Sequence, residues 1–75
     1  MPRDTLIRQI NQIRDEILIL GSMVEQATLS AIQALKNRDI NLAREIFEAD
    51  QTINEKRFAI ENAIIILMAT QQPMA

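Results

Sequence analysis

The chain has 75 residues, a formal net charge of −2, and neither Cys nor His. This length allows one small domain, and the missing Cys and His exclude disulfide bridges and the usual zinc ligands as its means of stabilisation. The nearly balanced charge, together with the absence of Tyr and Trp, argues against nucleic-acid binding, which normally uses a basic face and aromatic stacking platforms.

The first predicted element is a long helix over about residues 4–36. Pro2 followed by Asp4 or Thr5 is typical of a helix start, because a short oxygen-bearing side chain can accept hydrogen bonds from the free amides of the first turn. Apolar residues then recur at alternating spacings of four and three, which is the pattern of a heptad seam. The seam comprises Leu6, Ile10, Ile13, Ile17, Leu20, Val24, Ala27, Ala31 and Ala34.

Gly21 interrupts the middle of this helix. A glycine in a helix interior costs about 1 kcal/mol relative to alanine, because it loses more backbone freedom on folding. We expect Gly21 to allow close packing against a neighbouring helix, and a gentle kink at Gly21 and Ser22 is the alternative explanation.

A short turn over residues 37–39 separates the two predicted helices. The first helix should end near Lys36, because Asn37 can adopt the left-handed conformation that closes many helices. Asp39 is then suited to cap the next helix, which is predicted over about residues 40–70. So short a turn makes the two helices antiparallel neighbours, and we expect it to stand free of other contacts.

The second helix carries its own heptad seam, which consists of Leu42, Ile46, Ala49, Ile53, Ile60, Ala63 and Leu67. Lys56 occupies the one seam position between Ile53 and Ile60 that is not apolar. This cation either sets the register of an oligomer, as a polar seam residue can, or extends along its flexible stem to reach water.

These elements predict an all-α, antiparallel two-helix hairpin that forms a single module over residues 1–75. Two helices bury only one stripe each, which rarely offsets the conformational entropy lost on ordering the chain. We therefore expect two copies to complete a four-helix bundle as a dimer. A third helix that is absent from this chain would be the alternative cover for the apolar run over residues 64–68.

No targeting or membrane-spanning segment is expected. Mixed polar sequence follows residues 1–5, whereas a secretory leader has a continuous apolar stretch there. The longest apolar run covers residues 63–69 and is far short of the roughly 20 residues that span a bilayer. The lack of Cys fits a reducing cytoplasm.

Several short strings, in order along the chain, resemble the PhoU family of phosphate-signalling regulators. They are Leu-Gly-Ser-Met-Val-Glu-Gln at residues 20–26, the segments 31–35, 37–39 and 42–43, Asp-Gln-Thr-Ile-Asn at residues 50–54, and the segments 59–61 and 72–73. In the family, strings like the first lie on the first helix, and strings like the next three form the turn to the second helix. The second helix carries the motif Asp-x-x-(Ile/Val)-Asn. An Ile-Glu and a Pro then precede the third helix.

The resemblance implies the first two helices of a three-helix bundle, and hence a partial PhoU-like domain. The third helix of the family carries a Glu/Asp-x-x-x-Asp motif associated with metal binding, but no carboxylate of this chain is followed four residues later by Asp. The resemblance therefore implies no metal ligands and no cofactor in this chain. It also implies a cytoplasmic adaptor for phosphate uptake and phosphate signalling, which contacts a membrane sensor kinase and a phosphate ABC transporter at the periphery of their membrane complexes.

Four polar residues form a stripe beside the second seam, at spacings of four, three and four: Asp50, Asn54, Arg57 and Glu61. They could be a solvated flank with an Arg57–Glu61 pair, or could make polar contacts with a third helix or a partner. A third hypothesis is a hard-cation site that uses Asp50, Glu61 and Glu25, since oxygen ligands suit Mg or Ca and carboxylates also hold iron in helical bundles. Glu25 is otherwise a surface charge, or a partner for Lys56 or Arg57 across the hairpin.

Two other functions are alternatives to the adaptor. The chain could be a structural oligomerisation hairpin with no role in phosphate regulation. More remotely, residues 10–20 resemble the opening helix of a helical chorismate mutase, whose site needs several cations to converge on a dicarboxylate. The available cations are no denser than on an ordinary surface: Arg8, Arg14, Lys56 and Arg57. Because His, Cys and Tyr are all missing, we predict that the chain is not an enzyme.

Overall fold

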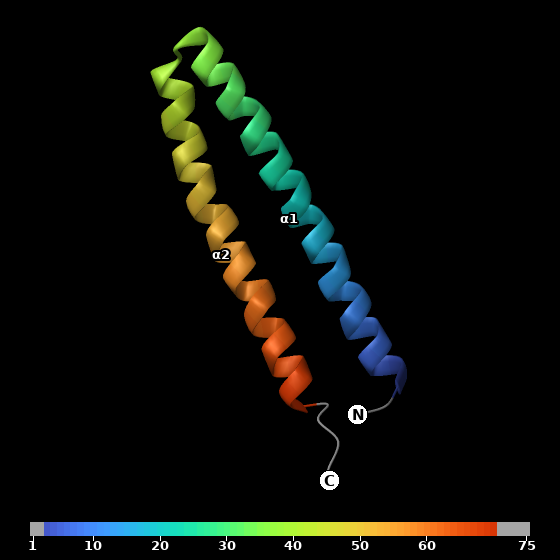
Figure 1. Ribbon diagram of the computed structural model, residues 1–75. Helices are drawn as coiled ribbons and strands as arrows, with labels where there is room; N and C mark the ends of the chain where they lie inside the picture. Colours follow the sequence, from blue (N-terminus) through green and yellow to red (C-terminus); the bar gives the residue numbers. More distant parts are fainter. Residues whose placement is uncertain (1–2, 71–75) are drawn as a thin grey trace.

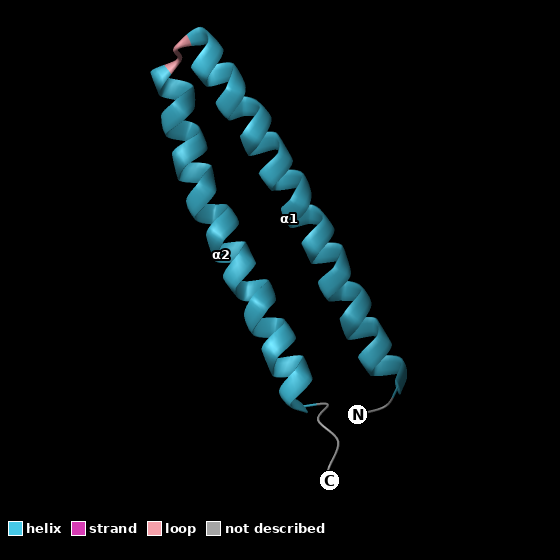
Figure 2. Ribbon diagram, in the orientation of Figure 1, coloured by secondary structure: helices cyan, strands magenta, loops and turns pink. Residues whose placement is uncertain are grey.

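Two long α-helices make up residues 3–70, the part of the chain that the computed structural model describes. Helix α1 spans Arg3–Asn37 and helix α2 spans Ile40–Thr70. The helices run side by side and antiparallel, so that α1 begins beside the end of α2 (Figure 1). Within the described residues, the helices are interrupted only by a short turn (Figure 2). The predicted all-α hairpin is confirmed, and the bounds of α1 differ by one residue at each end from those expected.

The turn is a Schellman motif that closes α1. The amide of Asp39 donates to the carbonyl of Ala34 at 2.9 Å, and the amide of Arg38 donates to the carbonyl of Leu35 at 3.3 Å. Arg38 adopts the left-handed conformation, with a φ of 51°. These bonds satisfy two carbonyls that the end of a helix otherwise leaves without partners.

The left-handed residue is not the one that the sequence indicates. Asn37 stays within α1, and Arg38 closes the helix instead. Asn tolerates this conformation better than Arg does, but the hydrogen bonds of the turn decide the position. With Arg38 left-handed, Asp39 can donate its amide to α1 and still cap α2. The cap itself is confirmed, because the amide of Leu42 donates to Asp39 Oδ1 at 3.0 Å.

The contact between the helices follows the predicted seam on α2. The residues of α2 that are buried or partly buried are Leu42, Ile46, Ile53, Lys56, Ile60, Ala63, Ile64 and Leu67, and of the predicted seam only Ala49 is exposed. The fully buried core is small: Ala34 on α1 is 6% exposed, and Ile53 and Ile60 on α2 are 8% and 4% exposed. Two helices exclude water only along their single line of contact, so the hairpin has little interior.

On α1, only half of the predicted seam faces α2. The confirmed half lies at intervals of seven residues and is buried or partly buried: Leu6, Ile13, Leu20, Ala27 and Ala34. The other half is exposed: Ile10, Ile17, Val24 and Ala31. Its places are taken by residues one position earlier: Gln9, Glu16, Met23 and Ser30. We call a row of residues at intervals of seven along one helix a heptad line. The residues on the two sides of such a line are equally close to it, and a spacing pattern cannot tell which side meets the partner helix. The prediction was therefore wrong for these positions.

By its length and composition alone, helix α1 could cross a membrane, because it contains an 18-residue window of mean hydropathy 1.3. The longest apolar run in the sequence had indicated no such candidate. Amphipathic helices that pack against protein pass the same test, and the apolar residues of α1 recur at heptad spacing on and beside the line of contact with α2. Only 6% of that window is buried in the hairpin, and Leu18 and Ile19 are 66% and 53% exposed, so contact with α2 alone does not account for the composition of α1.

Candidate partner interface

The two broad faces of the hairpin differ in chemistry, and we call them the apolar face and the polar face. On the apolar face, the border contributed by α1 is the exposed stripe Ile10, Ile17, Val24 and Ala31. On the polar face, the corresponding positions of α1 are Gln9, Glu16, Met23 and Ser30. The two sets lie on opposite flanks of the same heptad line, so they point to opposite sides of the hairpin.

At the open end of the hairpin, the apolar face is a groove lined only by apolar side chains: Leu6, Ile10, Ile13, Ile64, Leu67 and Met68. Ile13 and Leu67 also border a groove on the polar face, where their neighbours include Gln9, Gln12 and Glu16. Ile13 and Leu67 thus lie between an apolar surface and a polar one, and only the apolar surface is suited to exclude water.

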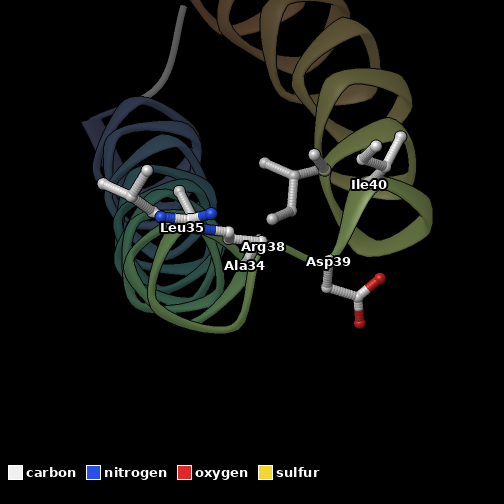
Figure 3. Close-up of a pocket in the computed structure, with 8 residues that line it drawn as sticks. Ala34, Leu35, Arg38, Asp39 and Ile40 are labelled. Atoms are coloured by element: carbon white, nitrogen blue, oxygen red, sulfur yellow. The ribbon is translucent and has the colours of Figure 1, made fainter.

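Near the turn, the apolar face has a second pocket, which is lined by Ala31, Ala34, Leu35, Arg38, Asp39, Ile40, Ala43 and Ile46. Figure 3 shows Leu35 and Ile40 on the two helices at either side of it, with the Asp39 carboxylate pointing away. Leu35 is 80% exposed and Ile40 is 69% exposed. Large exposed apolar side chains around a concave surface are typical of contact sites. This chemistry favours contact at the turn, where the sequence had indicated a free end.

The polar stripe of α2 lies along the middle of the apolar face. Asp50 and Arg57 share a heptad line with two lining residues, Ala43 near the turn and Ile64 near the open end. Asn54 and Glu61 lie on the adjacent heptad line of α2, which continues to Met68. All four polar residues are exposed. The border contributed by α2 is therefore apolar at both ends and charged between them.

Arg57 and Glu61 form the local pair that the sequence predicts. Arg57 Nη1 lies 3.1 Å from Glu61 Oε1, and both side chains are 50% exposed. The Arg57 guanidinium also lies 4.8 Å from the centroid of the Phe58 ring. A half-exposed pair of this kind contributes little to stability, so its main effect is to hold the guanidinium near the surface of α2. The predicted contacts of Asp50 and Asn54 with a partner stay a prediction.

Glu25 and Lys56 do not pair across the hairpin. Among residues 3–70, the ion pairs are Arg14–Asp15 and Arg57–Glu61, and Glu25 is exposed. Lys56 is partly buried and shares a heptad line with Leu42, Ala49 and Ala63, which line the polar face. A cation at that border can reach water along its stem. This position favours the snorkelling interpretation over a role in setting register through the apolar face.

Gly21 has no close neighbour in the hairpin. A methyl group placed on it would meet nothing within 4 Å, so close packing against α2 is not the reason for the glycine. Helix α1 continues through residues 21 and 22 without interruption. Gly21 lies on the heptad line that adjoins the apolar stripe, on the side away from α2. The expected close packing would have to involve a helix from outside this hairpin.

The carboxylates do not assemble a cation site in the part of the chain that the structure describes. Asp50 and Glu61 are eleven residues apart on one continuous helix, which is about 16 Å along the axis. No group of three or more Asp, Glu, His or Cys within residues 3–70 is placed to hold a metal ion. The pockets described above are likewise lined by none of the four cations that a chorismate mutase site would need: Arg8, Arg14, Lys56 and Arg57.

Comparison with known proteins places this hairpin in a family. The sequence model of the PhoU domain matches residues 17–75, which include most of α1 and all of α2. The chain belongs to the PhoU family. The family resemblance of the short strings is thereby confirmed. No solved structure gave a significant match.

Curated PhoU proteins align with nearly the whole chain. The phosphate-specific transport system accessory protein PhoU of Escherichia coli K12 is 36% identical over 67 residues, which cover 89% of this chain and 28% of that protein. The corresponding homolog of Clostridium acetobutylicum is 34% identical over 74 residues, which cover 99% of this chain and 34% of that protein. The homolog of Aquifex aeolicus is 27% identical over 70 residues. The chain thus spans about a third or less of the length of these relatives.

The sequence reasoning missed the most informative surface of this PhoU-family module. It treated the stripe from Ile10 to Ala31 as internal seam, although the structure exposes it, and it expected the turn over residues 37–39, which lies beside the exposed Leu35 and Ile40, to stand free of contacts. A signal was present: every seventh residue of α1 from Ile10 is apolar, while the opposite flank from Gln9 is mainly polar. Comparison of the two flanks would have indicated two unequal faces.

Proposed function

We propose that this chain is a helical module of a PhoU-type regulator of phosphate uptake, and that it acts by protein–protein contacts through the apolar face. Membership of the PhoU family supports the first part, as do the relatives named as accessory proteins of a phosphate-specific transport system. The second part rests mainly on one observation, the exposed stripe with Ile10 at 51%, Ile17 at 45% and Val24 at 45% exposure. Extended exposed apolar surfaces of this kind mark interaction sites.

The partners that we propose are those implied by the family resemblance: the cytoplasmic parts of a membrane sensor kinase and of a phosphate ABC transporter. The module would work in the cytoplasm, at the periphery of these membrane complexes, and without catalysis of its own. The mixed border of the apolar face supports this assignment, because a charged stretch from Asp50 to Glu61 between apolar ends can discriminate among partners.

The test is a binding assay with the full chain immobilised and each purified cytoplasmic partner in solution. Ile17→Glu combined with Val24→Glu places two charges on the apolar face, and Gln9→Glu combined with Gln26→Glu places two charges on the polar face as the matched control. We expect the apolar-face variant to lose at least about tenfold in affinity, since a buried unpaired charge costs more than about 1.4 kcal/mol, while the control binds as the parent does. Failure of the parent to bind either partner, or equal binding by both variants, would refute the proposal.

The second candidate is a structural oligomerisation hairpin with no phosphate role. The same apolar face favours it, because a module that only associates with its own kind needs such a surface. The binding assay distinguishes the two functions. A chain that associates with itself and with neither transport partner is the structural hairpin.

A further inference from the structure

We infer that α2 carries a second docking surface, which binds a basic, heptad-patterned helix of a partner protein. The surface is a row of exposed residues at alternating spacings of four and three from Phe47 to Met68, and we call it the outer stripe. Its large apolar side chains are Phe47, Phe58, Ile65 and Met68. Met68 also lines the groove of the apolar face at the open end, so the two surfaces share that edge. The inference goes beyond the proposed function, because it assigns a different surface and a different occupant.

Both aromatic residues of the chain lie on the outer stripe. The chain has two Phe and neither Tyr nor Trp. Phe47 is 68% exposed and Phe58 is 59% exposed. They are eleven residues apart on one continuous helix, so they project to the same side of α2, about 16 Å from each other along its axis. Aromatic side chains supply much of the energy of cores and interfaces. Two of them on one exposed row therefore favour a contact site.

The outer stripe lies on a different side of α2 from the contact with α1. The buried residues Ile53 and Ile60 mark that contact. Phe58 follows Ile53 by five residues, and Ile65 follows Ile60 by five, which places both about 140° further round the helix. The border of the apolar face runs through Asp50, only about 50° from the contact line. A helix that lies on the apolar face, between α1 and α2, therefore leaves Phe58 and Ile65 exposed, so the outer stripe needs its own occupant.

The charges beside the outer stripe indicate the chemistry of that occupant. Three exposed carboxylates flank it, with Glu48 and Glu55 on one side and Asp50 on the other. Neither of the ion pairs within residues 3–70 involves any of these three residues. Arg44 lies at the turn end of this side, and the flanks from Phe47 onward stay acidic as far as Glu55. In paired helices, the charges that flank the apolar row select the partner. Lys or Arg on the flanks of a partner helix would be complementary here.

The same features argue against two other occupants. A second copy of this chain would bring the same acidic flanks to the contact, and an anionic bilayer would also be repelled by them. The middle of the outer stripe is formed by Gln51 and Asn54, whose amides need hydrogen-bond partners once water is excluded. Hydrocarbon offers none, whereas a polar residue within the apolar row of a partner helix does and would also fix the register.

Two peptide probes test the charge of the occupant. The basic probe is a fluorescein-labelled helical peptide of about three heptads, with Leu in the apolar row, one central Asn and Lys on both flanks. The acidic probe has Glu in place of each Lys. Each probe is titrated with the full chain and followed by fluorescence anisotropy. We expect the basic probe to bind at least about tenfold more tightly than the acidic one at low salt, and the difference to shrink at about 1 M salt. Equal affinities at low salt would overturn the inference.

Substitutions on the outer stripe test the location. Phe47→Ala combined with Phe58→Ala is expected to weaken binding of the basic probe at least about tenfold. The matched control is Leu18→Ala combined with Leu29→Ala. These leucines are also eleven residues apart, on α1, and are 66% and 60% exposed. We expect the control to bind as the parent does. Equal losses in both variants, or no loss in the Phe variant, would contradict the outer stripe as the site.

Reversal of the flanking charge tests the specificity. Glu48→Lys combined with Glu55→Lys should transfer the preference from the basic probe to the acidic one. An unchanged preference would show that these carboxylates do not face the occupant. Circular dichroism of each variant shows that the helices are intact, so that a loss of binding is not read from an unfolded chain.

Two further measurements separate this inference from the alternatives. Ile17→Glu combined with Val24→Glu should bind the basic probe at least as tightly as the parent; a loss would place the probe on the apolar face and overturn the inference. Cosedimentation of the parent with vesicles of phosphatidylcholine and phosphatidylglycerol, if abolished by the Phe variant, would instead identify the outer stripe as a membrane-binding surface. Failure of the parent to bind the sensor kinase and the transporter would refute the proposed function and leave the probe measurements unaffected.

Discussion

Replacement of Arg38 by glycine tests how α1 is closed. The φ of Arg38 is 51°, a conformation that costs about 1–2 kcal/mol for a residue with a Cβ atom and almost nothing for glycine. Glycine also makes the unfolded chain more flexible, which opposes this gain by about 0.4–1 kcal/mol. Both hydrogen bonds of the closing turn use backbone atoms and survive the change. Arg38→Gly is therefore expected to stabilise each chain by roughly 0.5–1 kcal/mol.

The measurement is thermal unfolding followed by circular dichroism, with all variants at the same protein concentration, since any association between chains would make the midpoint depend on concentration. For a domain of this size, the expected gain raises the midpoint by about 2–8 °C. Asn37→Gly is the matched control. Because Asn37 is the last residue of α1, glycine there should lower stability by a few tenths of a kcal/mol. If Asn37→Gly stabilised the chain and Arg38→Gly destabilised it, Asn37 would be the left-handed residue, and the assigned closing motif would be wrong.

Four further substitutions probe the cap, the core, an exposed position on α2 and the middle of α1. Asp39→Ala removes the acceptor of the Leu42 amide and should cost about 1 kcal/mol in urea unfolding; an unchanged midpoint would mean that the cap contributes nothing. Ile60→Ala, at 4% exposure, should cost about 2–4 kcal/mol, and Ile65→Ala, at 64% exposure, well under about 1 kcal/mol; equal losses would contradict the assigned seam. Gly21→Ala should stabilise the hairpin by about 1 kcal/mol, because a methyl group there meets nothing within 4 Å; an unchanged or lowered unfolding midpoint would contradict this expectation.

Much of the fold was predictable because it depends on local periodicity. The spacing of Leu42, Ile46, Ile53 and Ile60 predicts both the helix and the face that it buries, since an α-helix returns the same side to its neighbour every three to four residues. Asp39 was equally predictable as a cap, because its carboxylate acts on amides within its own first turn. The family resemblance was also available from short strings in a fixed order.

The candidate interface was only partly predictable. The spacing of Asp50, Asn54, Arg57 and Glu61 indicates one stripe and the local Arg57–Glu61 pair, because both depend on a single helix. Which side of the hairpin carries that stripe depends on how α1 and α2 are rotated against each other. The sequence could not show that Asp50 and Arg57 lie on the same broad face as Ile10 and Ala31, or that Lys56 lies on the other.

By itself, the sequence determined the helices, their antiparallel order, the seam of α2 and the shortage of buried surface, all of which follow from interactions between residues close along the chain. Only the tertiary structure decided that the contact on α1 passes through Gln9 and Glu16, so that Ile10, Ile17 and Val24 are exposed, and that Arg38 closes α1. The physical reason is the same in both cases. A heptad pattern and a turn sequence each permit neighbouring solutions of similar local energy, and the packing of one whole helix against the other selects among them.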